Sequence, residues 1–327
     1  KMVDLKIMGW NYQITYIEHR NTKQNILRID KDHYKNLNTG EIKEVKHKES
    51  RADSKKTVKQ SLKKIRELIN TNIVEVEKAL WVTLTYKENM TDPKRLYKDF
   101  DKFMKRLRYN YQDYNIEYIN VCEPQARGAW HCHVILIFDK QAPYIANEKM
   151  SEIWGHGFTK TNMIYNINNI GAYLTSYLSD MELEEVEENK IEYEINNVKE
   201  VLIDNQKKKV VKNSRLSLYP PGFRFYRKSK GIKNPIVERM SYASAKRKIG
   251  LPYPTFFGGV KIIDKENGFS NIIYREYYNL KADYLTKVQR DGTYVSVFNK
   301  WKPKEYFCRL NLKRWSSSER RCVQVIR

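Results

Sequence analysis

Two strand-like runs separated by a short polar segment constrain the fold of this chain more than any other feature. Residues 116–123 and residues 130–138 are rich in apolar and β-branched side chains, which is typical of strands buried in a core. Two strands that follow one another so closely favour a hairpin. We therefore expect a central antiparallel sheet with mixed edges and with helices packed on it.

Helical and strand patterns alternate along the flanking sequence. Asp92-Pro93 supplies a helix cap followed by a first-turn proline, and an apolar stripe at helical spacing comes after it. Together these patterns predict the α+β class. The expected helices cover residues 55–73, the segment from Pro93 to Leu107, 147–153 and 168–180, and the expected strands cover 79–86, 116–123, 130–138 and 157–167.

Shifts in charge suggest how the chain is divided. At 327 residues with 41% hydrophobic side chains, it is long enough for two domains. Residues 181–200 hold eight glutamates and two lysines, whereas residues 207–248 hold fourteen Lys or Arg and one acid. We expect N-terminal strands and turns over 1–50, a core domain over 51–180, an acidic linker or helix over 181–200, and a basic, aromatic C-terminal extension over 201–327 that binds DNA or a partner or completes the fold.

The net charge of +22 indicates a polyanionic partner. Nucleic acid is the simplest choice, because no long basic amphipathic helix suggests a membrane anchor and 24 tyrosines can stack on unpaired bases. The alternative is the bias of a lysine-rich proteome. The candidate DNA contacts are Arg127, Arg224, Arg227, Lys228 and Lys230, of which the last four interleave with aromatic residues in a pattern that also fits a strand with inward and outward faces.

Cysteine usage and hydropathy indicate the compartment. The four cysteines form no CxxC pair, and Cys122 and Cys132 lie in strand-like runs where a thiol behaves as a small buried hydrophobe. The chain has no run of about 18 apolar residues and no secretory signal at its start. We therefore expect no disulfides, no membrane contact and a reducing cytoplasmic location.

His131 and His133 are the strongest candidates for chemistry. Residues two apart in a strand point to the same face, and Glu123 or Gln125 can reach the same point across the hairpin. Two nitrogens and one oxygen leave positions open on a divalent ion for water and a phosphate oxygen. A lone histidine pair is more often a core or surface feature, but the buried strand and the carboxylate at hairpin distance favour a metal site.

Tyr173 and Tyr177 lie four residues apart in the helix expected over residues 168–180, and therefore on one face. By itself such an aromatic stripe more often packs into a core. The chemical alternative is a phenolate that attacks a phosphodiester and forms a covalent tyrosyl phosphate beside a metal ion. The second tyrosine can then attack in turn.

Three motifs in this order resemble the HUH endonucleases of the rolling-circle replication initiator type, which include filamentous-phage gene II-like and small-plasmid replication proteins. The first motif is Trp81-Val-Thr-Leu-Thr85, the second is His131-Cys-His133, and the third is Tyr173-Leu-Thr-Ser-Tyr177, as in two-tyrosine members. The resemblance covers residues 50–240 and implies Glu123 as the third metal ligand.

The resemblance also implies a function. It implies a divalent metal, Mg or Mn, on the sheet face, and site-specific nicking of origin DNA through a 5′ phosphotyrosine, with both single-stranded and duplex origin DNA as partners. A host polymerase would extend the free 3′ hydroxyl. Many members carry a lysine just before the second tyrosine and another three residues after it, where this chain has Ser176 and Asp180. By the same resemblance, Tyr177 attacks first and Tyr173 second.

Several interpretations stay open at this point. The chain contains no GxxxxGK[ST] motif, so a P-loop ATPase is not encoded and a separate host helicase is expected to unwind the DNA. A mobilisation relaxase or a two-tyrosine transposase would use the same nicking chemistry. A non-catalytic DNA-binding protein, with the histidines and tyrosines merely in its core, is the alternative from a different class.

Overall fold

The computed structural model describes most of the chain and groups it into two compact units. The described residues are 1–20, 25–45, 55–164, 180–203, 206–220, 223–264, 269–280 and 322–326. One unit consists of residues 1–24 with 235–327, and the other of residues 25–234. Residues 1–50 and 201–327, which were expected as separate segments, therefore each contribute to both units.

A five-stranded sheet forms the centre of the second unit. Its strand order is β13-β7-β8-β6-β9, and every neighbouring pair is antiparallel. The antiparallel sheet with flanking helices confirms the predicted α+β class. The strands are β6 (Ala79–Leu84), β7 (Ile116–Pro124), β8 (Trp130–Phe138), β9 (Thr159–Met163) and β13 (Tyr226–Lys228).

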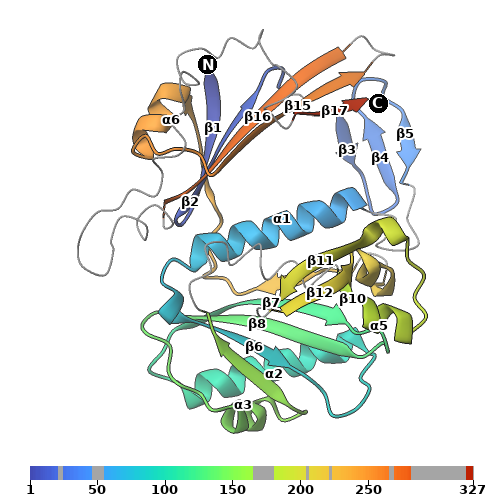
Figure 1. The fold of residues 1–327 in the computed structure, drawn as a ribbon, viewed down its shortest axis with the longest axis vertical. Coiled ribbons are helices and arrows are strands. Elements are labelled where there is room, and N and C mark those ends of the chain that lie inside the picture. Colours follow the sequence, from blue (N-terminus) through green and yellow to red (C-terminus); the bar gives the residue numbers. More distant parts are fainter. Residues whose placement is uncertain are drawn as a thin grey trace. The chain divides into compact units, whose positions relative to one another are not determined.

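Among the described residues, three helices pack on this sheet: α1 (Lys55–Asn72), α2 (Pro93–Asn110) and α3 (Asn147–Trp154). In Figure 1, α1 runs above the sheet, and α2 and α3 lie below it. Apolar side chains of all three helices and of the sheet belong to one buried core. At the start of α2, the Asp92 carboxylate accepts a hydrogen bond from the backbone N–H of Lys94, and Pro93 is the first helical residue, as predicted.

The β7–β8 hairpin matches the pattern read from the sequence. Its turn places Gly128 at φ +86°, a left-handed conformation that favours glycine. Alternate residues of β8 from Trp130 to Phe138 are buried on the face opposite the histidines. On that buried face, Cys122 and Cys132 are directly paired as free thiols, and both donate to the side-chain oxygen of Asn120.

In a second antiparallel sheet, strands from the acidic stretch and the basic stretch pair with each other. The acidic stretch contains the helix α5 (Leu183–Glu188) and the strand β11, whereas the basic stretch supplies β12. Lys208 pairs with Glu182 at 2.6 Å and Lys207 with Glu200 at 3.1 Å. The strands are β10 (Met181–Glu182), β11 (Val198–Ile203) and β12 (Gln206–Val211), and single-turn helices η2 (Val76–Lys78), η3 (Ile195–Asn197) and η4 (Ser214–Leu218) also belong to this unit.

A small antiparallel meander completes the second unit. Its strands are β3 (Ile26–Arg28), β4 (His33–Asn36) and β5 (Ile42–Glu44).

The described residues of the first unit form a six-stranded sheet of order β14-β1-β2-β16-β15-β17 and include one helix, α6 (Tyr242–Lys248). Its β16 pairs with β2, which joins residues more than 250 positions apart, and only the β15–β17 pair is parallel. No helix in the described ranges is long and apolar enough to cross a bilayer. The strands are β1 (Met2–Met8), β2 (Asn11–Ile17), β14 (Ile236–Ser241), β15 (Phe256–Asp264), β16 (Phe269–Asn279) and β17 (Cys322–Ile326).

Candidate functional site

The register of the β7–β8 hairpin brings the three predicted ligands to one face of the sheet. Glu123 lies directly opposite His131, and Val121 lies opposite His133. Directly opposed residues of an antiparallel pair share a face, so Glu123, His131 and His133 project together. Both histidines are half-buried, and Glu123 is buried.

Two of these side chains are close together and not fully satisfied. The Nε2 atom of His133 lies 3.3 Å from Oε1 of Glu123. The Nε2 atom of His133 and the Oε2 atom of Glu123 are nevertheless both buried without a hydrogen-bond partner. Buried polar atoms are nearly always paired, so these two atoms are suited to a ligand.

The hydroxyl of Thr83 on β6 sets the orientation of the His133 ring. Its Oγ1 atom is 3.2 Å from Nδ1 of His133, and the register pairs the two residues directly. With Nδ1 engaged in this hydrogen bond, Nε2 is the ring nitrogen that faces Glu123. A hydrogen bond to the outer ring nitrogen is the usual support of a metal-binding histidine.

Local electrostatics leave the carboxylate charged and one imidazole neutral. Burial opposes ionisation of Glu123, but attraction to His133 and Arg215 outweighs it and lowers the pKa of Glu123 to about 2. Burial is the main cause that lowers the pKa of His131 to about 4, against the attraction of Glu123. At neutral pH the site therefore presents an anionic oxygen donor and an uncharged imidazole, the protonation states that bind a metal ion.

The donor set fits a divalent cation. Two imidazoles and one carboxylate suit Mn²⁺ and related ions, and they leave coordination positions for water and a phosphate oxygen. In the described ranges, no three His, Cys, Asp or Glu side chains already stand at the spacing of an assembled metal centre. The fit is therefore one of donor chemistry and of the two unsatisfied atoms on His133 and Glu123.

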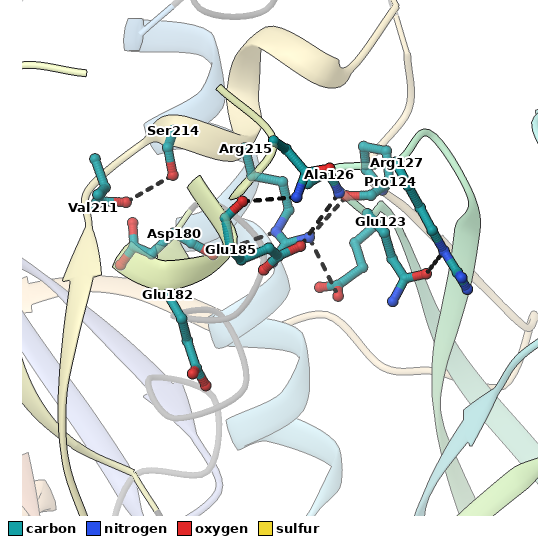
Figure 2. Close-up of polar contacts among 12 residues, drawn as sticks. Glu123, Pro124, Ala126, Arg127, Asp180, Glu182, Glu185, Val211, Ser214 and Arg215 are labelled. Carbon is teal, nitrogen blue, oxygen red and sulfur yellow. Dashed lines mark hydrogen bonds and ion pairs between the residues drawn. The ribbon is translucent and has the colours of Figure 1, made fainter. Parts of the chain in front are cut away.

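The predicted nucleophiles, Tyr173 and Tyr177, lie outside the described residues. The first described residue after them is Asp180. Arg215 connects it to the sheet face that bears Glu123, His131 and His133, which we call the metal face because it is the candidate metal site. The Arg215 Nε atom donates to the carbonyl oxygen of Asp180 at 3.3 Å. The guanidinium also lies 3.7 Å from the Glu123 carboxylate, as Figure 2 shows.

Arg215 and Lys160 were not singled out by the sequence. Arg215 is one of fourteen basic residues in residues 207–248, and only its burial distinguishes it. Lys160 on β9 pairs with Thr83, which itself pairs with His133, so the exposed Lys160 projects from the metal face. Two strand spacings put its backbone about 10 Å from that of His133.

Three of the five candidate DNA contacts are exposed: Arg127, Arg224 and Lys230. Arg127 lies in the hairpin turn next to the metal face, where its Nε atom donates to the side chain of Gln125 at 3.1 Å. An exposed arginine in this position is free to meet a phosphate.

The other two candidates, Arg227 and Lys228, are half-buried on β13 and bonded within the protein. Arg227 donates to Asp101 at 3.1 Å and lies 5.0 Å from the centre of the Tyr97 ring. Lys228 donates to the carbonyl oxygen of Ile232 at 2.8 Å. Arg227 therefore links β13 to α2, and Lys228 is bonded to the segment that follows β13.

Comparison with known proteins bears on the same region. Residues 79–182 match the family model for replication-associated proteins of the ORF2 and gene II protein type. The matched segment spans about a third of the chain and includes β6, α2, the β7–β8 hairpin and both tyrosines. No curated protein and no solved structure matches the chain. The family match supports a replication-initiator role and the DNA binding that such a role implies.

Proposed function

We propose that this protein is a site-specific DNA endonuclease and strand transferase of the HUH type, which starts rolling-circle replication of a plasmid or phage by nicking an origin. The observation that carries the proposal is the Glu123–His133 pair, with its two unsatisfied buried atoms, on a hairpin inside the segment matched by the replication-protein family. At this pair we expect a metal ion to bind and to act on the DNA phosphate.

In the proposed reaction, the phenolic oxygen of Tyr177 attacks the phosphorus of one phosphodiester. The bond from phosphorus to the 3′ oxygen breaks, the 3′ oxygen takes up a proton, and the 5′ phosphate remains esterified to the tyrosine. Tyr173 attacks a second phosphodiester later, which permits a second strand transfer. The proton lost by the phenol balances the one gained by the 3′ oxygen, and one phosphoester bond replaces another, so the DNA ends can be rejoined by the reverse step.

The chain's own residues orient the reacting phosphate. His131, His133 and Glu123 would hold a Mg²⁺ or Mn²⁺ ion, which supplies a Lewis acid for the phosphate oxygens. Thr83 fixes the ring of His133. Lys160 projects from the same face and offers a charge for the phosphate oxygens where the chain lacks lysines at positions 176 and 180.

The remaining parts of the proposal concern partners. The exposed Arg127, Arg224 and Lys230 contact the DNA backbone near the nick, and Arg227 and Lys228 act mainly by holding β13 in place. Unwinding depends on a host helicase and extension on a host polymerase. A mobilisation relaxase or a two-tyrosine transposase would share the nicking step and differ in the DNA that it recognises.

A covalent-adduct assay tests the proposal. The full chain is incubated with Mn²⁺ and overlapping single-stranded oligonucleotides that tile the DNA on either side of its coding sequence. We expect one oligonucleotide to yield an adduct stable on a denaturing gel. Chelation of Mn²⁺, or His131→Ala, is expected to abolish it.

The tyrosines supply the matched controls. Tyr177→Phe should remove most of the adduct, and the double variant with Tyr173→Phe should remove all of it. Tyr144→Phe, at an exposed tyrosine between β8 and α3, should leave the adduct unchanged. An adduct that persists in the double variant would contradict the tyrosine mechanism, and DNA binding without any adduct would favour the non-catalytic alternative.

A further inference from the structure

Arg215 is a buried cation at a junction of four chain segments. Its side chain, from η4, is 7% exposed. Its Nη1 atom donates to the carbonyl oxygen of Pro124 at 2.8 Å and lies 3.7 Å from Oε1 of Glu123. Its Nη2 atom lies 3.6 Å from Glu185. A guanidinium with several directed donors suits such a junction because it can serve several acceptors at once.

One side of the junction is the β7–β8 hairpin, which carries the candidate metal ligands. Arg215 contacts the last two residues of β7, Glu123 and Pro124, immediately before the turn. Glu185, which faces Arg215, accepts a hydrogen bond from the backbone N–H of Ala126 at 3.3 Å. Arg215 and Glu185 therefore hold three of the four residues from Glu123 to Ala126.

The other side of the junction is Asp180, three residues after Tyr177. Its carbonyl oxygen accepts from Arg215 at 3.3 Å. Its carboxylate accepts from Lys212 at 2.5 Å and from the backbone N–H of Asn213 at 3.0 Å. Figure 2 shows Arg215 between Glu123 and Pro124 on one side and Asp180 and Glu185 on the other.

Stability alone does not explain why a buried arginine occupies this position. A buried ion pair is costly to desolvate, and a well-packed apolar side chain is often as stable in its place. What a rigid, many-bonded arginine adds is a fixed geometry among the segments it joins. Here the joined segments are the carboxylate of the metal face and the chain that leaves the nucleophile motif.

We propose that Arg215 is a positioning residue for the nicking reaction: it fixes Glu123 of the metal face relative to Asp180, which follows Tyr177 by three residues in the sequence. The inference rests on the proposed function. Arg215 acts through Glu123 and Asp180 and need not touch DNA. Removing it therefore slows the covalent step without weakening DNA binding, because misplacement of reacting groups costs rate steeply.

The test compares Arg215→Gln and Arg215→Lys with the wild-type chain. The measured quantities are the single-turnover rate of adduct formation at saturating oligonucleotide and Mn²⁺, and the Kd for the same oligonucleotide. The rate is normalised to the folded fraction. We expect Arg215→Gln to lower the rate about tenfold or more, Arg215→Lys to recover part of it by restoring the charge, and the Kd to stay unchanged.

Arg106 provides a matched control. It is half-buried and donates from Nε and Nη2 to the carbonyl oxygens of Ile153 and Trp154, both at 2.6 Å, so it joins α2 to α3. Arg106→Gln removes an arginine of similar bonding without touching the metal face. We expect it to lower the stability of the protein and to leave the normalised rate unchanged.

Glu185→Gln covers the case in which Arg215→Gln does not fold. It removes the charge that faces Arg215 and keeps an oxygen for the N–H of Ala126, at a side chain that is partly exposed. We expect a smaller fall in the same rate. Wild-type rates in both Arg215 variants, or equal falls in the Arg106 and Arg215 variants, would overturn the positioning role. A wild-type chain that forms no adduct would instead refute the proposed function.

Discussion

Replacing Thr83 by valine exchanges the hydroxyl that bonds Nδ1 of His133 at 3.2 Å for a methyl group of similar size. The change leaves one nitrogen of a half-buried imidazole without its partner. A lost neutral hydrogen bond costs about 0.5–1.5 kcal/mol of folding free energy. Loss of the outer partner of a metal-binding histidine typically weakens metal affinity about 10–100-fold, or roughly 1.4–2.8 kcal/mol. The effect on metal binding should therefore exceed the effect on stability.

Calorimetric titration with Mn²⁺ measures the first quantity, and urea denaturation without metal measures the second. Thr85→Val is the matched control, because the Thr85 hydroxyl donates to the carbonyl oxygen of Phe158 at 2.7 Å, whereas the Thr83 hydroxyl bonds His133. Both variants should lose similar stability, and only Thr83→Val should raise the Kd for Mn²⁺. Equal Mn²⁺ affinities in the two variants would refute the argument that Thr83 orients a metal ligand.

Three further predictions use the same assays. Lys160→Ala should slow adduct formation about tenfold, whereas Lys149→Ala on α3, where the lysine pairs with Glu152, should not; equal rates would exclude a role for Lys160 at the phosphate. The free energy of unfolding should fall on acidification, because the pKa values of both groups are lower in the folded protein than in the unfolded chain: about 4 against 6.5 for His131, and about 2 against 4.5 for Glu123. The unfolded chain therefore takes up these protons at a higher pH than the folded protein does. Glu123→Gln should reduce the fall in stability below about pH 4.5, as measured by urea denaturation. The logarithm of the Kd for single-stranded DNA should rise linearly with the logarithm of salt concentration, and a flat response would show that the charge of +22 is not used on nucleic acid.

The parts of the fold that the sequence predicted well are those with local patterns. The strand expected over residues 130–138 is β8, with the same bounds, and the cap at Asp92 lies where the sequence indicates it. Alternation along a strand and capping depend on near neighbours only. Once the strand was predicted, the shared face of His131 and His133 followed from the period of two, whereas Glu123 and Gln125 both stayed possible across the hairpin.

Long-range pairing could not be predicted in the same way. The pairing of β2 with β16 joins residues 11–17 to residues 273–279, and a strand's pattern gives its buried face but not its partner. The burial of single basic residues could not be predicted for a related reason. Arg215 is buried and Arg227 bonds Asp101, because each meets acidic residues that are distant in sequence.

The two oxygens of Glu123 have different surroundings, and this difference decides what the site can bind. Oε1 lies 3.3 Å from Nε2 of His133 and 3.7 Å from Arg215, whereas Oε2 is buried without a hydrogen-bond partner. Attraction to His133 and Arg215 on the Oε1 side lowers the pKa of Glu123 and keeps this buried carboxylate ionised, although burial opposes its ionisation. A metal ion at the same oxygen would face the charge of Arg215, so Oε2 is the oxygen available to it. Arg215 thus helps to keep the Glu123 carboxylate ionised while it contacts Oε1 and leaves Oε2 available to a metal ion.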